Sequence, residues 1–231
     1  MAARVPGAAA LGLLAPPSAP AVPAAFLADA GWTADRLTTL GARYASDDRR
    51  VLATVWWYSA SSVLLTPALA GLATGLPLSA RLVDTSVALL GGGTPIAATS
   101  SAPGTDTAAE LRESLSAVVD AVAAAGRMRA RPLWAIATDS LANRLLALGR
   151  AVGDVGAATA LAGPLAAAVG PPLPAPRYVD VPRPDGSTAR FTHRASCCLA
   201  YLVPDDVVCT SCPRRPPVER RVLLEDAATR S

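Results

Sequence analysis

Four cysteines are the residues of this chain best suited to chemistry. Cys197, Cys198, Cys209 and Cys212 are the only cysteines among the 231 residues, and all four lie in one short stretch. Two intervening residues allow Cys209 and Cys212 to close on one metal ion from a tight turn. A disulfide scaffold would spread its cysteines along the chain to join distant loops. The clustering therefore predicts a metal site in a reducing compartment.

The adjacent pair Cys197 and Cys198 is the unusual half of the pattern. Side chains of neighbouring residues in an extended chain project in opposite directions, so these two thiolates do not easily coordinate one small tetrahedral ion. A binuclear cluster is larger and accepts neighbouring thiolates more readily. The spacing therefore favours a [2Fe–2S] cluster, with zinc and a redox disulfide as the alternatives. His193 is the only histidine, which excludes a Rieske centre because that centre needs two.

Composition indicates a packed protein and limits its functions. Hydrophobic residues make up 52% of the chain and charged residues 17%, which is typical of a folded core and not of disorder. The net charge of +3 is too weak for a nucleic-acid binder, which needs a dense basic patch. Gly91, Gly92 and Gly93 are followed by no P-loop lysine, so they indicate a turn. No G-x-G-x-x-G motif indicates a nicotinamide or flavin site.

A long uncharged stretch, residues 51–80, has the length of a membrane span. Pro67 and Pro77 interrupt it, and serine and threonine hydroxyls occupy its middle. We therefore expect buried core helices and no transmembrane span, while peripheral membrane association stays open. Trp56 and Trp57 are expected to pack in the core, and Pro67 to break or kink the helix.

Local patterns predict the remaining elements. Thr107 to Glu110 matches a capping box, so Thr107 is the expected N-cap of a helix that ends at Gly126. Asp185-Gly186 is typical of a hairpin turn. The expected helices cover residues 33–45, 46–65, 107–126, 132–148 and 155–169, and the expected hairpins cover 81–100 and 177–192.

These elements together predict an α+β fold that is mainly α-helical. A helical domain with a small antiparallel hairpin would precede a short C-terminal β-hairpin and a four-cysteine iron–sulfur module, separated by a proline-rich linker at 170–176. The expected parts are a loose Pro/Ala-rich segment at 1–30, a helical domain at 31–170, a cluster-binding module at 177–217 and a tail at 218–231.

A family resemblance appears in the cysteine stretch. The run from Arg194-Ala-Ser-Cys197-Cys198 through Pro204 to Cys209-Thr-Ser-Cys212-Pro213 resembles the C-terminal signature of the FhuF family of ferric siderophore reductases. The C-C-x10-C-x2-C spacing matches without a gap. Residues 31–170 match the family's order of elements only loosely, so the resemblance identifies no substrate-docking residue there.

The resemblance implies a cofactor, a reaction and a location. Cys197, Cys198, Cys209 and Cys212 would hold a [2Fe–2S] cluster that passes one electron to Fe(III) in a siderophore, often of hydroxamate type. The resulting Fe(II) is released, and the work is cytoplasmic. The electron donor would be another protein or a soluble reductant. A ferredoxin-like carrier and a zinc-stapled binding protein are the competing hypotheses.

Overall fold

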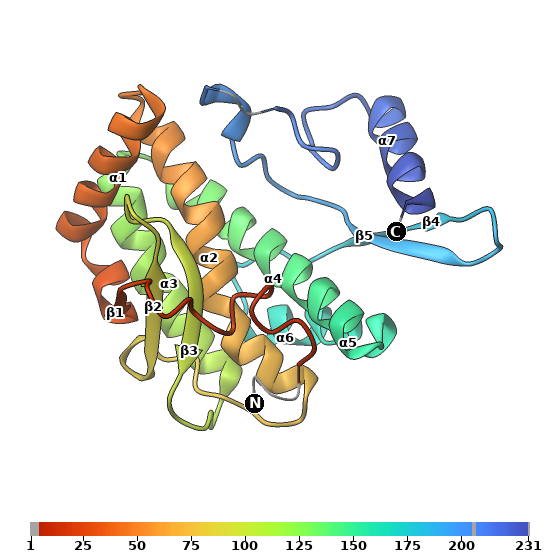
Figure 1. The fold of residues 1–231 in the computed structure, drawn as a ribbon, viewed down its shortest axis with the longest axis horizontal. Coiled ribbons are helices and arrows are strands. Elements are labelled where there is room, and N and C mark those ends of the chain that lie inside the picture. The colour runs from red at the N-terminus through yellow and green to blue at the C-terminus, as the bar shows by residue number, and fades with distance from the viewer. Residues whose placement is uncertain (1–4, 205–206, 231) are drawn as a thin grey trace.

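The computed structural model describes residues 5–204 and 207–230. A helical body with a small sheet forms one side of the molecule, and the last part of the chain forms an arm beside it (Figure 1). Three strands form one antiparallel sheet and two form a separate hairpin. The predicted α+β class, mainly helical, is confirmed.

Two long helices, α2 (Arg49–Ala73) and α4 (Ala130–Val152), form the centre of the body and pack along each other. Asp48 caps α2 by accepting from the amides of Arg50 and Val51. Trp56 and Trp57 are 2% and 0% exposed, which confirms their core role. A helix that is apolar all round is stable only when buried, and α2 fits that rule.

Pro67 does not break α2, because the helix continues through it to Ala73. Proline removes one backbone hydrogen bond, but the burial of α2 on several sides outweighs that loss. Pro164, in contrast, lies where a predicted helix is interrupted. The expected helix at 155–169 is divided into α5 (Val155–Ala160) and α6 (Ala162–Val169), since Pro164 cannot donate to the carbonyl of Ala160.

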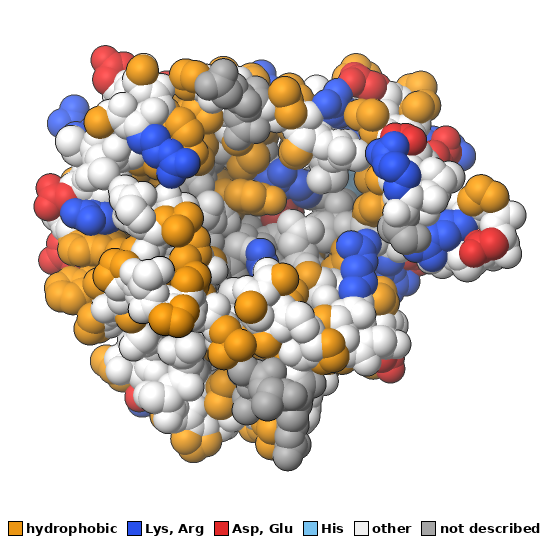
Figure 2. All heavy atoms as spheres, in the orientation of Figure 1, with side chains coloured by type: hydrophobic (Ala, Val, Ile, Leu, Met, Phe, Trp, Pro, Cys, Tyr) orange, Lys and Arg blue, Asp and Glu red, His pale blue; other side chains and the backbone are white. Residues whose placement is uncertain are grey.

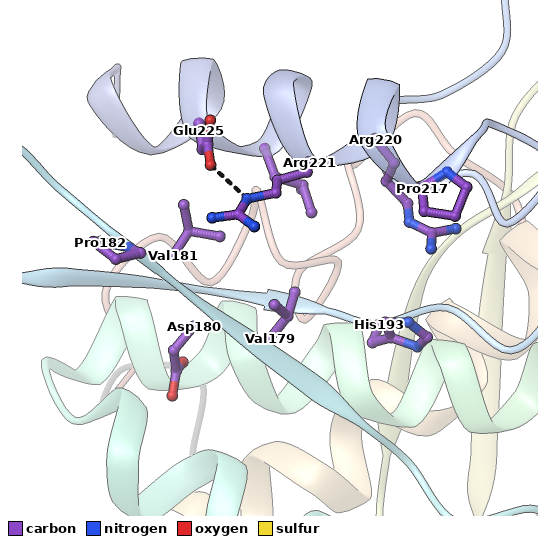
Figure 3. Close-up of a pocket in the computed structure, with 10 residues that line it drawn as sticks. Val179, Asp180, Val181, Pro182, His193, Pro217, Arg220, Arg221 and Glu225 are labelled. Atoms are coloured by element: carbon purple, nitrogen blue, oxygen red, sulfur yellow. Dashed lines mark hydrogen bonds and ion pairs between the residues drawn. The ribbon is translucent and has the colours of Figure 1, made fainter.

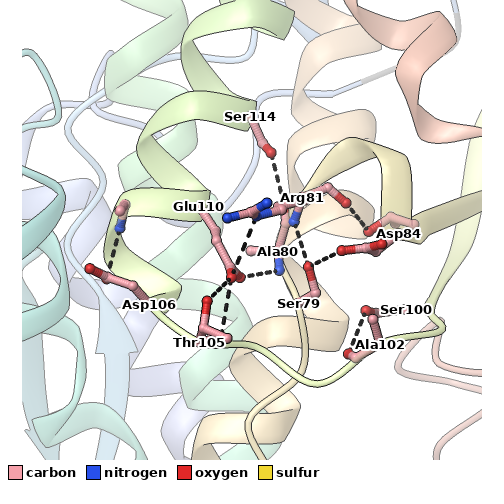
Figure 4. A network of polar contacts seen from close by, with 12 residues as sticks. Ser79, Ala80, Arg81, Asp84, Ser100, Ala102, Thr105, Asp106, Glu110 and Ser114 are labelled. Atoms are coloured by element: carbon pink, nitrogen blue, oxygen red, sulfur yellow. Dashed lines mark hydrogen bonds and ion pairs between the residues drawn. The ribbon is translucent and has the colours of Figure 1, made fainter.

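The remaining body helices are α1 (Ala30–Tyr44) and α3 (Thr107–Ala125). Asp106, and not the expected Thr107, caps α3 by accepting from the Ala109 amide at 3.0 Å. Glu110 bonds back to this cap residue, because the Asp106 amide donates to its carboxylate. The buried carboxylate also accepts from the amides of Ala80 at 3.0 Å and Thr105 at 3.2 Å (Figure 4). The contact with Ala80 ties α3 to the segment that follows α2.

The sheet has the order β1 (Ala21–Pro23), β2 (Thr85–Leu89) and β3 (Pro95–Ser100). The predicted glycine hairpin corresponds to β2 and β3, and Gly92 and Gly93 have positive φ in its turn. Strand β1 was not predicted, because three residues that include a proline show no alternation. The N-terminal segment expected to be loose also buries Val5 and Leu13 in the core.

The arm consists of β4 (Tyr178–Pro182), β5 (Thr188–Thr192) and α7 (Pro217–Thr229). Asp185-Gly186 forms the predicted hairpin turn, with Gly186 at φ 84°. The segment expected to be a tail is thus helical over most of its length, and it packs on the hairpin (Figure 3). A second, small hydrophobic core joins them, made of Val181, Ala189, Leu224 and Ala228.

None of the helices that the structure describes combines the length and the apolar character needed to cross a bilayer. Residues 51–73 of the uncharged stretch belong to the buried helix α2.

Candidate metal centre

The four cysteines lie between β5 and α7, on a stretch that we call the cysteine loop (residues 193–216, described except for 205–206). All four are free thiols. The Sγ atoms of Cys197 and Cys212 are 3.7 Å apart. The thiols of Cys198 and Cys209 hydrogen-bond to each other. The loop therefore brings the predicted residues together as two pairs.

Each pair takes one cysteine from each half of the motif. The adjacent Cys197 and Cys198 belong to different pairs, as their opposite projection predicts. Cys209 and Cys212, expected to close on one ion, also contact different partners. A tetrahedral metal with metal–sulfur bonds of about 2.3 Å sets two ligand sulfurs about 3.8 Å apart. The Cys197–Cys212 spacing is close to that value.

Two pairs suit a binuclear centre better than a mononuclear one. A [2Fe–2S] cluster takes four thiolates, two for each iron. Within the described residues, no group of three or more His, Cys, Asp or Glu side chains is arranged to hold a single metal ion. Four thiolates are the donor set that the cluster requires, and their arrangement in two pairs fits two neighbouring irons.

Backbone groups of the loop support the sulfurs. Leu199 has a left-handed backbone with φ 60°, which turns the chain directly after Cys198. The amides of Leu199 and Ala200 donate to the sulfurs of Cys197 and Cys198. The Cys212 amide donates to the Cys209 carbonyl at 3.1 Å and closes the second turn. Hydrogen bonds to sulfur stabilise thiolates and tune the potential of a cluster.

Burial differs within each pair. Cys198 and Cys212 are 8% and 1% exposed, whereas Cys197 and Cys209 are half-buried. Each pair therefore has one sulfur inside the protein and one near its surface. A group held between them is shielded from bulk water on one side and lies close to solvent on the other.

Arg194 is a buried cation beside the Cys198–Cys209 pair. Its Nη1 atom donates to Cys209 Sγ at 3.1 Å and lies 3.9 Å from Cys198 Sγ. Its guanidinium carbon lies 5.0 Å from the ring centroid of Tyr58 on α2. Nε and Nη2 are buried and have no hydrogen-bond partner among the described residues. Such a cation favours the thiolate form of its neighbours.

Asp139 on α4 holds the start of the cysteine loop. Its buried carboxylate accepts from the amides of Ala195 at 2.7 Å and Ser196 at 3.0 Å, and from the Ser196 hydroxyl at 2.7 Å. It also lies 3.6 Å from Nε of Arg194. One carboxylate of the body thus fixes both the loop backbone and the cation beside the sulfurs.

Sequence reasoning missed Asp139 and Tyr58, which are far from the cysteines along the chain. The only signal for Asp139 is a single carboxylate in the otherwise uncharged stretch of α4 between Arg131 and Arg144. Tyr58 gave no signal, because an aromatic residue in an apolar helix normally packs in a core. Both residues become visible only when α2 and α4 are placed beside the loop.

The thiol pKa values follow the contacts. The hydrogen bond from Cys209 lowers the pKa of Cys198 to about 5, against the opposing effect of burial and with help from Arg194. The same bond raises the pKa of Cys209, which acts as its donor. Burial raises the pKa of Cys197. These contacts therefore favour the thiolate form of Cys198, which is the form that binds metal.

His193 forms no hydrogen bond with a cysteine in the part of the chain that the structure describes. It lies just after β5 and is half-buried in a cleft between the hairpin and α7, together with Arg220 (Figure 3). Its backbone amide donates to the Arg177 carbonyl at 2.9 Å. The only histidine of the chain therefore belongs to the arm and not to the sulfur pairs.

Comparison with known families gave one match. Residues 194–214 match the family model described as the FhuF 2Fe-2S C-terminal domain. This segment is a FhuF-type C-terminal 2Fe–2S domain. No curated protein and no solved structure gave a match to the chain. The resemblance found in the sequence is confirmed.

The FhuF-type domain determines the cofactor and the general class of the protein. Its cofactor is a [2Fe–2S] cluster, so the protein is an iron–sulfur protein related to ferric siderophore reductases. The matched segment begins at Arg194 and includes all four cysteines. It includes neither Asp139 nor Tyr58, through which the body contacts the FhuF-type domain.

Proposed function

We propose that the protein is a ferric siderophore reductase in which Cys197, Cys198, Cys209 and Cys212 hold the [2Fe–2S] cluster. The arrangement of the four thiols as two pairs within a FhuF-type domain is the observation that carries the proposal. The bound cluster supplies one electron, which reduces Fe(III) in the siderophore to Fe(II).

The protein's own residues provide the setting for that transfer. The Cys197–Cys212 and Cys198–Cys209 pairs would supply the four thiolates that hold the cluster. Arg194 lies against the second pair and offsets part of its negative charge. Asp139 fixes the loop, so the sulfurs are positioned before the metal arrives. No acid or base is required, because the reaction moves an electron and no proton.

Reduction explains iron release in terms of ligand preference. Siderophores bind Fe(III) through hard oxygen atoms, and Fe(II), with its lower charge, is held much less tightly by such ligands. The protein would therefore act in the cytoplasm, after the siderophore has been imported. Its electrons would come from another protein or a soluble reductant.

Anaerobic spectroscopy of the full chain tests the proposal. We expect red-brown protein whose visible absorption bleaches with dithionite and recovers when a ferric trihydroxamate is added, while Fe(II) appears in a chelator assay. Replacement of Cys198 or Cys212 by serine should abolish the colour. Ser101→Ala, a change in an exposed loop of the body, is the control and should retain it.

Two results would contradict the proposal in different ways. Colourless protein with one zinc ion per chain would indicate a zinc-stapled binding protein. A cluster that bleaches and recovers with a protein partner, but not with any of several ferric chelates, would indicate a ferredoxin-like carrier.

A further inference from the structure

A polar cavity of about 530 Å³ lies against the cysteine loop. It is open to solvent and is lined by residues of α2, α4, the start of β3 and the turn between Cys209 and Cys212. On the face shown in Figure 2, the surface is hollowed between the body and the arm, and arginine atoms line part of the hollow. The side chains that give the cavity its polarity are Tyr58, Ser59, Ser62, Ser140, Asn143, Arg144 and Ser211.

Arg144 is the only charged side chain among the residues that line this cavity. Its Nε atom donates to Ser62 Oγ at 2.5 Å, and its Nη1 atom donates to the Leu11 carbonyl at 3.3 Å. It forms no ion pair with any carboxylate in the described part of the chain. Burial lowers the pKa of Arg144, although a guanidinium stays charged in proteins.

The guanidinium of Arg144 can still bind a ligand. A partly buried cation without a counter-ion is unfavourable unless something pairs with it. Ser62 and Leu11 hold two of the three guanidinium nitrogens, Nε and Nη1. The third, Nη2, has no hydrogen-bond partner among the described residues. A guanidinium held in this way is arranged to bind anionic or strongly polar oxygen atoms.

The cavity is also joined to the sulfur pairs. Ser211 lies between the cysteines of the second turn and lines the cavity. Tyr58 forms another part of its wall, and the ring of Tyr58 is stacked on Arg194, which donates to Cys209 Sγ. A ligand in the cavity would therefore be separated from the cluster ligands by one turn of backbone and one stacked side-chain pair.

We propose that this cavity, which we call the Arg144 cavity, is where the ferric chelate binds, with Arg144 and the hydroxyls around it contacting the chelate's oxygen atoms. The proposal rests on the proposed function and names the binding site of its substrate. The substrate class is an oxygen-rich Fe(III) complex without net positive charge, because the lining contains one cation and no carboxylate. One electron passes to Fe(III), which becomes Fe(II), and no bond of the chelate is broken by the transfer.

A second cavity next to Cys197 is the competing location. It measures about 400 Å³ and is edged by Arg50, Arg127 and Arg129. These three arginines are exposed, so water and salt screen their charges. Much of the lining is apolar, which suits a protein surface or an apolar ligand better than a compact, oxygen-rich complex. We therefore use Arg129 as the matched control.

Binding can be measured without any electron transfer. Gallium(III) has the charge of iron(III) but is not reduced under these conditions, so its complexes report binding alone. We would titrate the full chain by calorimetry with the gallium complexes of a neutral trihydroxamate, of a tricatecholate and of citrate. Arg144→Met should weaken the binding of each complex that binds by roughly tenfold or more, the effect of losing a charged hydrogen bond. Arg129→Met should leave it within about twofold.

Tyr58→Phe is the second variant, in case Arg144→Met disturbs folding. It keeps the ring on Arg194 but removes a hydroxyl that has no hydrogen-bond partner among the described residues. Gallium-complex binding should weaken severalfold, and the visible spectrum of the cluster should be unchanged.

The results separate this inference from the proposed function. Binding that depends on Arg144, in a protein that reduces no ferric chelate, would support the cavity and contradict the reductase. Reduction whose KM is unchanged in Arg144→Met but raised in Arg129→Met would overturn the Arg144 cavity and leave the reductase intact. Failure of all three gallium complexes to bind would also overturn it.

Discussion

Arg194 concentrates several roles in one side chain. It contacts a sulfur of the Cys198–Cys209 pair, stacks on Tyr58 and faces Asp139, and it is 5% exposed. Its charge is therefore little screened by water, in contrast to the exposed arginines of the chain. Within the described residues, no cation hydrogen-bonds to a sulfur of the Cys197–Cys212 pair, so the electrostatic surroundings of the two pairs differ.

Replacing Arg194 tests how this charge affects the cluster. Reduction adds an electron, and a nearby positive charge favours the reduced form. Arg194→Gln should therefore lower the reduction potential, by about 59 mV for each tenfold change in the one-electron equilibrium. Arg194→Lys keeps the charge and should show a smaller shift. The measurement is a redox titration followed by electron paramagnetic resonance, and equal potentials in all three proteins would contradict the assignment.

Asp139 should matter more for stability than its single charge suggests. Asp139→Ala leaves Arg194 without its carboxylate and orphans two loop amides, and removal of one member of a buried charged pair costs about 3–5 kcal/mol. We expect the free energy of unfolding to fall by about 3 kcal/mol in a denaturant titration. Asp120→Ala, at an exposed position of α3, is the control and should change it by less than about 0.5 kcal/mol.

At the scale of elements, the end of α2 is packed so closely that one glycine is required. A Cβ atom on Gly71 would lie 2.6 Å from the Leu76 carbonyl oxygen and 2.8 Å from the Leu78 nitrogen. Both are backbone atoms, so neither can rotate away. The chain that follows α2 can turn back over the helix only because residue 71 has no side chain.

Two glycine substitutions should therefore have opposite signs. Gly71→Ala should destabilise the protein by more than about 1 kcal/mol, although alanine is intrinsically the better helix former. Gly163→Ala in α6 should stabilise it by up to about 1 kcal/mol, because nothing lies within 4 Å of the added Cβ. Thermal unfolding of both variants checks this prediction. Equal changes in melting temperature would contradict it, because they would show that helix propensity alone sets the stability of both variants.

At the scale of the whole molecule, the body and the arm have cores of very different size. The core of the arm contains four buried residues, whereas that of the body includes most of the buried side chains of five helices and the sheet. Regions with few buried apolar contacts open at lower free energy. The amides of β4, β5 and α7 should exchange with solvent faster than those of α2 and α4, measured by hydrogen–deuterium exchange. Equal protection would contradict this.

The sequence was informative where chemistry or local pattern was dense. Cysteine spacing indicated the cluster, and Asp185-Gly186 indicated the hairpin. Asp139 and Tyr58 could not be predicted, because their roles depend on which helix faces lie beside the cysteine loop. The pairing of Cys197 with Cys212 was likewise hidden, since spacing specifies which residues are close along the chain and not which sulfurs meet. Strand β1 forms only because β2 offers it an edge.

Helix α7 contributes no cysteine, yet its position has a consequence for how metal is captured. Because α7 packs back on the β4–β5 hairpin, both ends of the cysteine loop are anchored to one small core. Anchoring reduces the loop-closure entropy lost when the two halves of the motif meet, and so raises the effective concentration of Cys209 and Cys212 near Cys197 and Cys198. By holding the two ends of the cysteine loop together, α7 makes the four thiols a preorganised multidentate ligand.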